Sequence, residues 1–175
     1  MSTIKVSTIS PLGTDATKTI TIGSAGDTVA GAGANTPSFG TRLSGNQSVN
    51  SATTTLITFD TEDWDTDNAF SSNRFTVPTN EGGKYLFQAY IDMYFGNANG
   101  ERIDVKLRIN GSNAKEFRNV VNGDPGLTQS TGLSAILNLS AGDYVEVYVY
   151  HTYGSAQNVV AGNFTYFQGQ KLIGV

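Results

Sequence analysis

The chain has 175 residues, of which 38% are hydrophobic, 10% aromatic and only 15% charged, with 20 glycines and no cysteine. This length allows a sizeable core, and low charge with many glycine and threonine residues is typical of an all-β protein. The formal net charge of −4 argues against nucleic-acid binding, and the missing cysteines exclude disulfides, thiolate metal sites and cysteine nucleophiles.

The first 40 residues predict an extended arm. Residues 4–9 and 20–22 alternate weakly between apolar and polar side chains, and residues 23–36 (GSAGDTVAGAGANT) are glycine-rich, as linkers are. We therefore divide the chain into an arm, residues 1–40, and a compact head, residues 41–175. The start of the chain lacks a signal-peptide core and no apolar run reaches membrane-helix length, so we expect synthesis in the cytoplasm and no membrane insertion.

An acidic segment follows a strand-rich stretch at residues 47–60. Asp63, Asp65 and Asp67 have the spacing that opens an EF-hand loop, which makes calcium a candidate ligand of these three carboxylates. The loop's later glycine and glutamate positions hold other residues, so we expect no EF-hand. The alternative is a solvated turn whose carboxylates cap backbone N–H groups.

Trp64 lies within this acidic segment and is the candidate ligand contact of the chain. A tryptophan beside aspartate and asparagine can stack on a sugar or anchor a protein partner. The alternative is that its ring closes one end of the hydrophobic core.

The longest predicted strand follows the sequence FTVP at residues 75–78 and a glycine-containing turn at 79–83. From residue 85 the chain alternates for eleven residues, so successive side chains point to opposite faces. One face is apolar and should line the core: Tyr85, Phe87, Ala89, Ile91, Met93 and Phe95. The other face includes Tyr90 and Tyr94, which is too aromatic for a plain solvated surface and predicts a second packing surface.

Further strands are predicted at residues 101–110, 113–121, 128–139, 144–150 and 162–173. Asn110-Gly111 predicts a type I′ hairpin turn. In the strand at 144–150, three valines alternate with Tyr144, Tyr148 and Tyr150, which join the tyrosines of the longest strand as candidate interface residues. Short strands at regular spacing, without a helical period, indicate an antiparallel sandwich or jelly roll.

The order of these landmarks resembles the C1q/TNF-type jelly roll. The matching stretches are FTVP at 75–78, GKYLF at 83–87, GLSAILNL at 132–139, GDYV at 142–145 and FTYFQGQKL at 164–172. The resemblance covers about residues 42–175 and implies an all-β, C1q/TNF-like antiparallel jelly-roll sandwich. It also implies a homotrimer that serves binding or display and not catalysis.

Residues 1–6 and 19–23 resemble the openings of fibre-type structural proteins of bacteriophages. This second resemblance implies a virion protein whose arm, residues 1–40, contacts other capsid or tail proteins. Three interpretations stay open: a tail-fibre or head-fibre protein that binds a host-surface glycan or protein, a capsid decoration protein without an obligatory ligand, and a non-viral C1q-like binder. For the first, we expect binding through loops at one end of the trimer, residues 60–74, 96–101, 122–127 and 152–161.

Catalysis has little support in the sequence. His151 is the only histidine, and no nucleophile motif lies near it. Five of the 15 carboxylates belong to one segment, residues 60–67, and the sequence does not give the separation of any catalytic pair. We therefore expect no enzymatic activity and no cofactor.

Overall fold

The computed structural model describes residues 35–96, 99–122 and 127–172. The predicted arm lies outside the described residues up to position 34. In the described part of the chain no helix is long and apolar enough to cross a membrane. The strands are β1 (Ser38–Arg42), β2 (Gln47–Val49), β3 (Thr55–Leu56), β4 (Thr61–Asp65), β5 (Phe70–Ser71), β6 (Arg74–Thr76), β7 (Gly83–Phe95), β8 (Asn99–Ile109), β9 (Ser112–Asn122), β10 (Leu127–Leu139), β11 (Tyr144–His151), β12 (Gln157–Val159) and β13 (Tyr166–Lys171).

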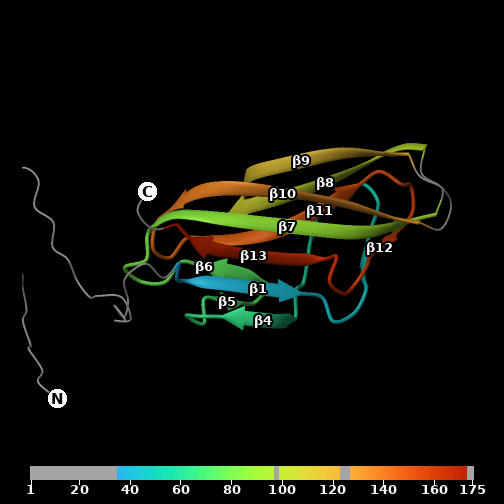
Figure 1. Cartoon of the computed structure of the whole chain (residues 1–175). Coiled ribbons are helices and arrows are strands. Elements are labelled where there is room, and N and C mark those ends of the chain that lie inside the picture. The colour runs from blue at the N-terminus through green and yellow to red at the C-terminus, as the bar shows by residue number, and fades with distance from the viewer. Residues whose placement is uncertain (1–34, 97–98, 123–126, 173–175) are drawn as a thin grey trace, which may run out of the picture. The chain divides into compact units, whose positions relative to one another are not determined.

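These strands form two antiparallel sheets, as the predicted jelly roll requires (Figure 1). The β7 sheet has seven strands in the order β2-β12-β7-β13-β1-β4, with β10 also paired to β7. The β11 sheet has six strands in the order β5-β6-β11-β8-β9, with β3 also paired to β11. Each sheet therefore has an inner face toward the core and an outer face.

Strand β7 is the central strand of its sheet. It pairs with β10 along its whole length, from Leu127 opposite Phe95 to Leu139 opposite Gly83, and with β13 on its other side. The apolar face predicted for this strand is confirmed, because every one of its six side chains is at most 1% exposed. The alternation in the sequence therefore sets which side of the strand faces the core.

The hairpin between β8 and β9 is also as predicted. Asn110 and Gly111 have φ values of 51° and 79°, the pair of positive angles that a type I′ turn requires. The Asn110 amide group also donates to the carboxylate of Asp143 at 2.8 Å and accepts from the Tyr144 backbone N–H at 3.0 Å. This turn is thus tied to the start of β11.

An aromatic cluster centred on β1 joins the two sheets. The sequence pattern does not predict this strand. The ring of Phe39 stacks on Phe70 and Phe75 at centroid distances of 5.3 and 4.9 Å and meets Phe167 edge-on at 4.9 Å. Phe39 is fully buried, so the core includes residues within the range that we assign to the arm. The strand-rich stretch at 47–60 also splits, because β2 joins the β7 sheet and β3 joins the β11 sheet.

Gly169 is expected to be required for the packing of this cluster. A Cβ atom at Gly169 would lie 2.6 Å from the Phe87 ring and 3.0 Å from the Phe39 ring. Gly169→Ala should therefore lower the free energy of unfolding by about 1–3 kcal/mol through overpacking. Urea denaturation followed by circular dichroism measures this, and Gly45→Ala is the matched control because nothing lies within 4 Å of its added Cβ. Equal midpoints for the two variants would contradict the prediction.

Candidate functional site

The outer face of the β11 sheet carries charged residues that form ion pairs with one another. Asp104 is fully buried and pairs with Arg118 on β9, at 2.8 Å from Nε to Oδ1, and with Arg102, at 3.2 Å from Nη2 to Oδ2. Glu116 pairs with Lys106 at 3.5 Å and with Arg118 at 3.2 Å. A network in which each charged side chain has an oppositely charged partner in the same chain is typical of a solvent-facing surface.

Tyr144, Tyr148 and Tyr150 lie on this same face, each beneath a cationic side chain. The guanidinium carbons of Arg74, Arg108 and Arg102 lie 4.5, 4.2 and 4.7 Å from the three ring centroids, and the Lys106 ammonium lies 5.5 Å from the Tyr150 ring. These are cation–π contacts. Partial burial, and then the carboxylate of Glu146, raise the pKa of Tyr148 above its ordinary value. The three rings thus have partners within the chain.

The outer face of the β7 sheet is different, because its centre carries aromatic, amide and hydroxyl side chains. Tyr90 on β7 stacks on Tyr166 of β13 with centroids 5.1 Å apart, and burial raises the pKa of Tyr166 with a smaller contribution from Tyr90. Tyr90 and Tyr94 are 39% and 41% exposed, and Ile136 on β10 is 57% exposed. The carboxylate of Asp92 is 4% exposed and accepts from the Ser130 hydroxyl at 2.9 Å.

A glycine lets the Tyr90 ring extend over the neighbouring strand. Gly132 on β10 is opposite Tyr90, and a Cβ there would lie 2.7 Å from its ring and 2.6 Å from the Ala89 carbonyl oxygen. Tyr90 and Tyr94 are thus exposed on the outer face of β7, where the sequence predicts a second packing surface. Because Tyr144, Tyr148 and Tyr150 lie on the other sheet, the five candidate interface tyrosines divide between two opposite faces.

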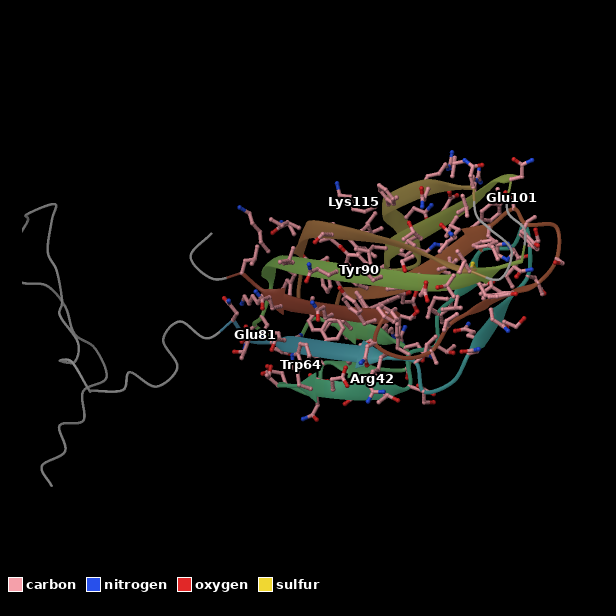
Figure 2. The ribbon with its side chains drawn as sticks, turned by 45° about the vertical axis from the view of Figure 1, so that its right-hand side comes forward. Arg42, Trp64, Glu81, Tyr90, Glu101 and Lys115 are labelled. Atoms are coloured by element: carbon pink, nitrogen blue, oxygen red, sulfur yellow. The ribbon has the colours of Figure 1, made fainter. Side chains whose placement is uncertain are left out.

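Trp64 lies on β4, at the edge of the β7 sheet, where Figure 2 shows it near Arg42 on β1. Its six-membered ring covers Gly40, where an added Cβ would meet ring atoms at 2.4–2.8 Å. The side chain is 46% exposed, so the alternative that Trp64 closes the core is wrong. Residues 61–65 form a strand, and the turn with a carboxylate cap that we considered for this segment follows it at residues 66–69.

Two hollows lie on the outer face of the β7 sheet, one lined by Trp64 and the other by Gly40, which the Trp64 ring covers. The first has a volume of about 290 Å³ and is lined by Gly40, Thr41, Arg42, Asp63, Asn163, Tyr166 and Gln168. The second has a volume of about 180 Å³ and is lined by Trp64, Leu86, Gln88, Gln168, Gly169 and Gln170. Gln168 borders both hollows. They combine aromatic surface with a few converging polar groups, as ligand sites do.

The three aspartates considered for calcium have separate partners. Asp63 pairs with Arg42 at 2.8 Å, and Asp67 accepts from the Thr66 hydroxyl at 2.6 Å. Asp65 caps the following turn by accepting from the backbone N–H groups of Ala69 at 3.0 Å and Phe70 at 2.8 Å. Across the described ranges, no group of three or more acidic, histidine or cysteine side chains is placed to hold a metal.

The loops that we expected to form one binding end do not all lie at the same end of the head. The described residues of three of these loops adjoin the end where β7 finishes, since Phe95 pairs with Leu127 and Met93 pairs with Val159. Across the sheet, Asp65 pairs with Phe39, Phe39 pairs with Gly169, and Gly169 pairs with Phe87 near the beginning of β7. The turn after Asp65 therefore lies at the opposite end of the head. The expectation of four clustered loops is therefore wrong.

His151 is fully buried and bonded on both ring nitrogens. Its Nε2 lies 3.0 Å from the Val49 carbonyl oxygen, which can only accept, so Nε2 donates. Its Nδ1 then accepts from the Tyr153 backbone N–H at 3.3 Å. The neutral ring thus connects backbone segments within the fold.

Sequence reasoning identified Trp64 but not the residues around it. Arg42, Asn163 and Gln168 lie far from it in the chain, and single polar residues in strands carry no local signal of a shared site. Gly40 has a weak signal, since glycine within a strand often marks a close approach by another group.

Comparison with solved structures identifies the fold. The globular domain of zebrafish complement 1qA protein is 17% identical, with a TM-score of 0.52, and the match covers 78% of this chain and 97% of that chain. Eiger TNF from S. frugiperda is 16% identical, with a TM-score of 0.57 and coverage of 79% and 92%. Murine APRIL is 14% identical, with a TM-score of 0.56 and coverage of 77% and 98%. Neither a protein-family model nor a curated protein matches the sequence. The head therefore has the C1q/TNF-like jelly-roll fold that the sequence predicts.

Asp104 is expected to stabilise the β11 sheet more than an exposed aspartate stabilises the β7 sheet. Asp104→Asn removes a fully buried charge between two arginines, whereas Asp63→Asn removes a partner of an ion pair whose side chains are 37% and 40% exposed. Exposed pairs contribute little, so only the first variant should clearly lower the urea midpoint. Equal urea midpoints for both variants would contradict the prediction that the buried Asp104 carboxylate stabilises its sheet more than the exposed Asp63 carboxylate does.

Proposed function

We propose that this chain forms the homotrimeric head of a surface appendage on a virus particle, displayed for binding to the host surface. The outer face of the β7 sheet makes the contact between copies, and the part of the arm that precedes β1 attaches the head to other particle proteins. The observation that carries the proposal is the contrast between the two outer faces: the centre of one carries exposed aromatic and aliphatic side chains without an exposed charge, and the other carries charges that pair with one another.

The centre of the outer face of the β7 sheet suits a contact between copies for energetic reasons. Burying Tyr90, Tyr94 and Ile136 removes apolar surface from water at a gain of about 25 cal/mol per Å². The tyrosine hydroxyls can then bond across the contact, and no exposed charge at the centre of the face loses its hydration. Tyr144, Tyr148 and Tyr150 already pack beneath cationic groups, so the proposal assigns the contact to the tyrosines of β7.

A closed ring of three copies also needs a second surface, because its contacts join two different patches of neighbouring copies. The edge formed by β9 and β10 offers one, since Phe117 is 48% exposed and Leu127 is 54% exposed. The C1q/TNF-type family that the sequence resembles is typically trimeric, which supports the same arrangement.

The particle context rests on the resemblance of residues 1–6 and 19–23 to fibre-type phage proteins. A head of this size with an N-terminal arm suits an appendage anchored by that arm and exposed at its other end. We propose no catalytic role, which agrees with a lone histidine whose two nitrogens both bond to backbone groups.

The trimer is tested by mass. Light scattering after gel filtration at micromolar concentration should give three times the chain mass of 18.6 kDa. Tyr90→Glu or Ile136→Glu should give monomers, because a carboxylate buried without a partner in the contact costs several kcal/mol. Ser71→Glu is the control, since Ser71 is exposed on β5, in the β11 sheet. A monomeric wild-type chain, or trimers of both face variants, would refute the contact.

The attachment role of the arm is tested by deleting residues 1–34, which spares β1 and its buried Phe39. The shortened head should fold and form trimers but be lost from particles assembled in infected cells. Cryo-electron microscopy of wild-type particles should place the head at a fibre or tail tip. Density spread over the capsid would instead favour a decoration protein, and normal incorporation of the deletion variant would refute the role of the arm.

A further inference from the structure

We propose that the hollows beside Trp64 bind a pyranose unit of a surface saccharide, which stacks on the indole ring. This inference builds on the proposed host-surface binding and assigns it to one place. The place is the β1–β4 edge of the β7 sheet and not the loops at the ends of the head.

The Trp64 ring is a preformed stacking platform. Three atoms of its six-membered ring lie so close to Gly40 that a Cβ there would be 2.4–2.8 Å from them. One face of the ring therefore lies against the strand backbone, and the 46% exposure of the side chain leaves the other face toward solvent. A flat, fixed and exposed aromatic ring is the surface on which the C–H groups of a sugar ring pack.

The groups around the platform can both donate and accept hydrogen bonds, as sugar hydroxyls require. The Gln168 amide nitrogen donates to the Gln88 amide oxygen at 2.7 Å. Within the described residues the Gln168 oxygen and the Gln88 nitrogen have no partner, which leaves one acceptor and one donor at the hollows. Asn163 adds a second amide, and the Arg42–Asp63 ion pair adds a guanidinium and a carboxylate that are 37% and 40% exposed.

The size and charge of the hollows select the ligand class. At about 290 and 180 Å³ they are at or below the lower limit of ordinary small-molecule pockets, about 300 Å³, which suits one or two sugar rings of a longer chain. Their single cation and single anion neutralise each other, so a neutral sugar suits them better than a phosphate or a polyanion.

The place of Trp64 is compatible with the proposed trimer. Strands β13 and β1 lie between β4 and β7 in the sheet order, so Trp64 itself lies away from Tyr90 and Tyr94, whereas the hollows extend from it to Tyr166 on β13 and to Leu86 and Gln88 on β7, beside the proposed contact. Figure 2 shows this separation between the labelled Trp64 and Tyr90. The competing occupant of this edge is a neighbouring copy of the chain, and the experiment below distinguishes it from a sugar.

Trp64 is the only tryptophan of the chain, so intrinsic fluorescence reports directly on the site. The full-length trimer is titrated with oligosaccharides of glucose, galactose, mannose and N-acetylglucosamine, and the same sugars are tested on a printed array. We expect acrylamide to quench the emission of the free trimer, and at least one sugar to protect against quenching with a saturable curve.

Three variants test the geometry by array binding. Trp64→Ala should lose binding at least tenfold, and Gly40→Ala should weaken it several-fold, because the added methyl group tilts the ring. Tyr148→Phe is the control on the opposite sheet and should bind normally. Circular dichroism and light scattering of each variant establish that the fold and the trimer are intact.

The outcomes separate this inference from the proposed function. If no sugar binds, or if binding survives Trp64→Ala, the saccharide site is refuted while the trimer stands. If acrylamide cannot quench Trp64 in the trimer, a neighbouring copy covers the edge, which also refutes the site. A monomer that binds sugar through Trp64 would instead support the site and refute the trimeric contact.

Discussion

The two faces of β7 control the organisation of the head. Its inner row of side chains is buried in the core, and its outer row carries exposed tyrosines. β7 pairs with β10 on one side and with β13 on the other. Because directly paired residues point to the same face, the alternation of inward and outward side chains on β7 also sets which side chains of β10 and β13 point into the core. A shift of one residue would move the aromatic row Tyr85, Phe87 and Phe95 into solvent, so the hydrophobic core and the outer tyrosine face depend on the same constraint.

The two sheets give the molecule two chemically different surfaces. The β11 sheet places arginine and lysine beside carboxylates and over tyrosine rings, which keeps that face compensated in water. The β7 sheet leaves aromatic rings, amides and two hollows at its surface. This difference between the two outer faces underlies both proposals.

The candidate site shows which features the local sequence pattern can indicate and which depend on strand pairing. Trp64 is noticeable from composition, because a lone tryptophan among aspartates is unusual, yet its role depends on Gly40, which follows from strand pairing between β1 and β4. The spacing of Asp63, Asp65 and Asp67 indicates calcium, but each carboxylate has a different partner: Asp63 pairs with Arg42, Asp65 caps the turn after β4, and Asp67 lies beyond the strand and accepts from Thr66. The acidic cluster in the sequence is therefore dispersed in space.

The sequence by itself determined the all-β class, most strands, the hairpin at Asn110-Gly111 and the buried row of β7, because these depend on period-two alternation and on turn residues that act locally. Only the tertiary structure decided that Phe39 belongs to the core, that the tyrosines divide between opposite faces and that Gln168 borders one hollow with Trp64 and another with Tyr166. These relations join residues far apart in the chain, and they exist only once the order of strands in each sheet is set. Local propensity contains no information on that order, since any two strands of similar pattern could pair.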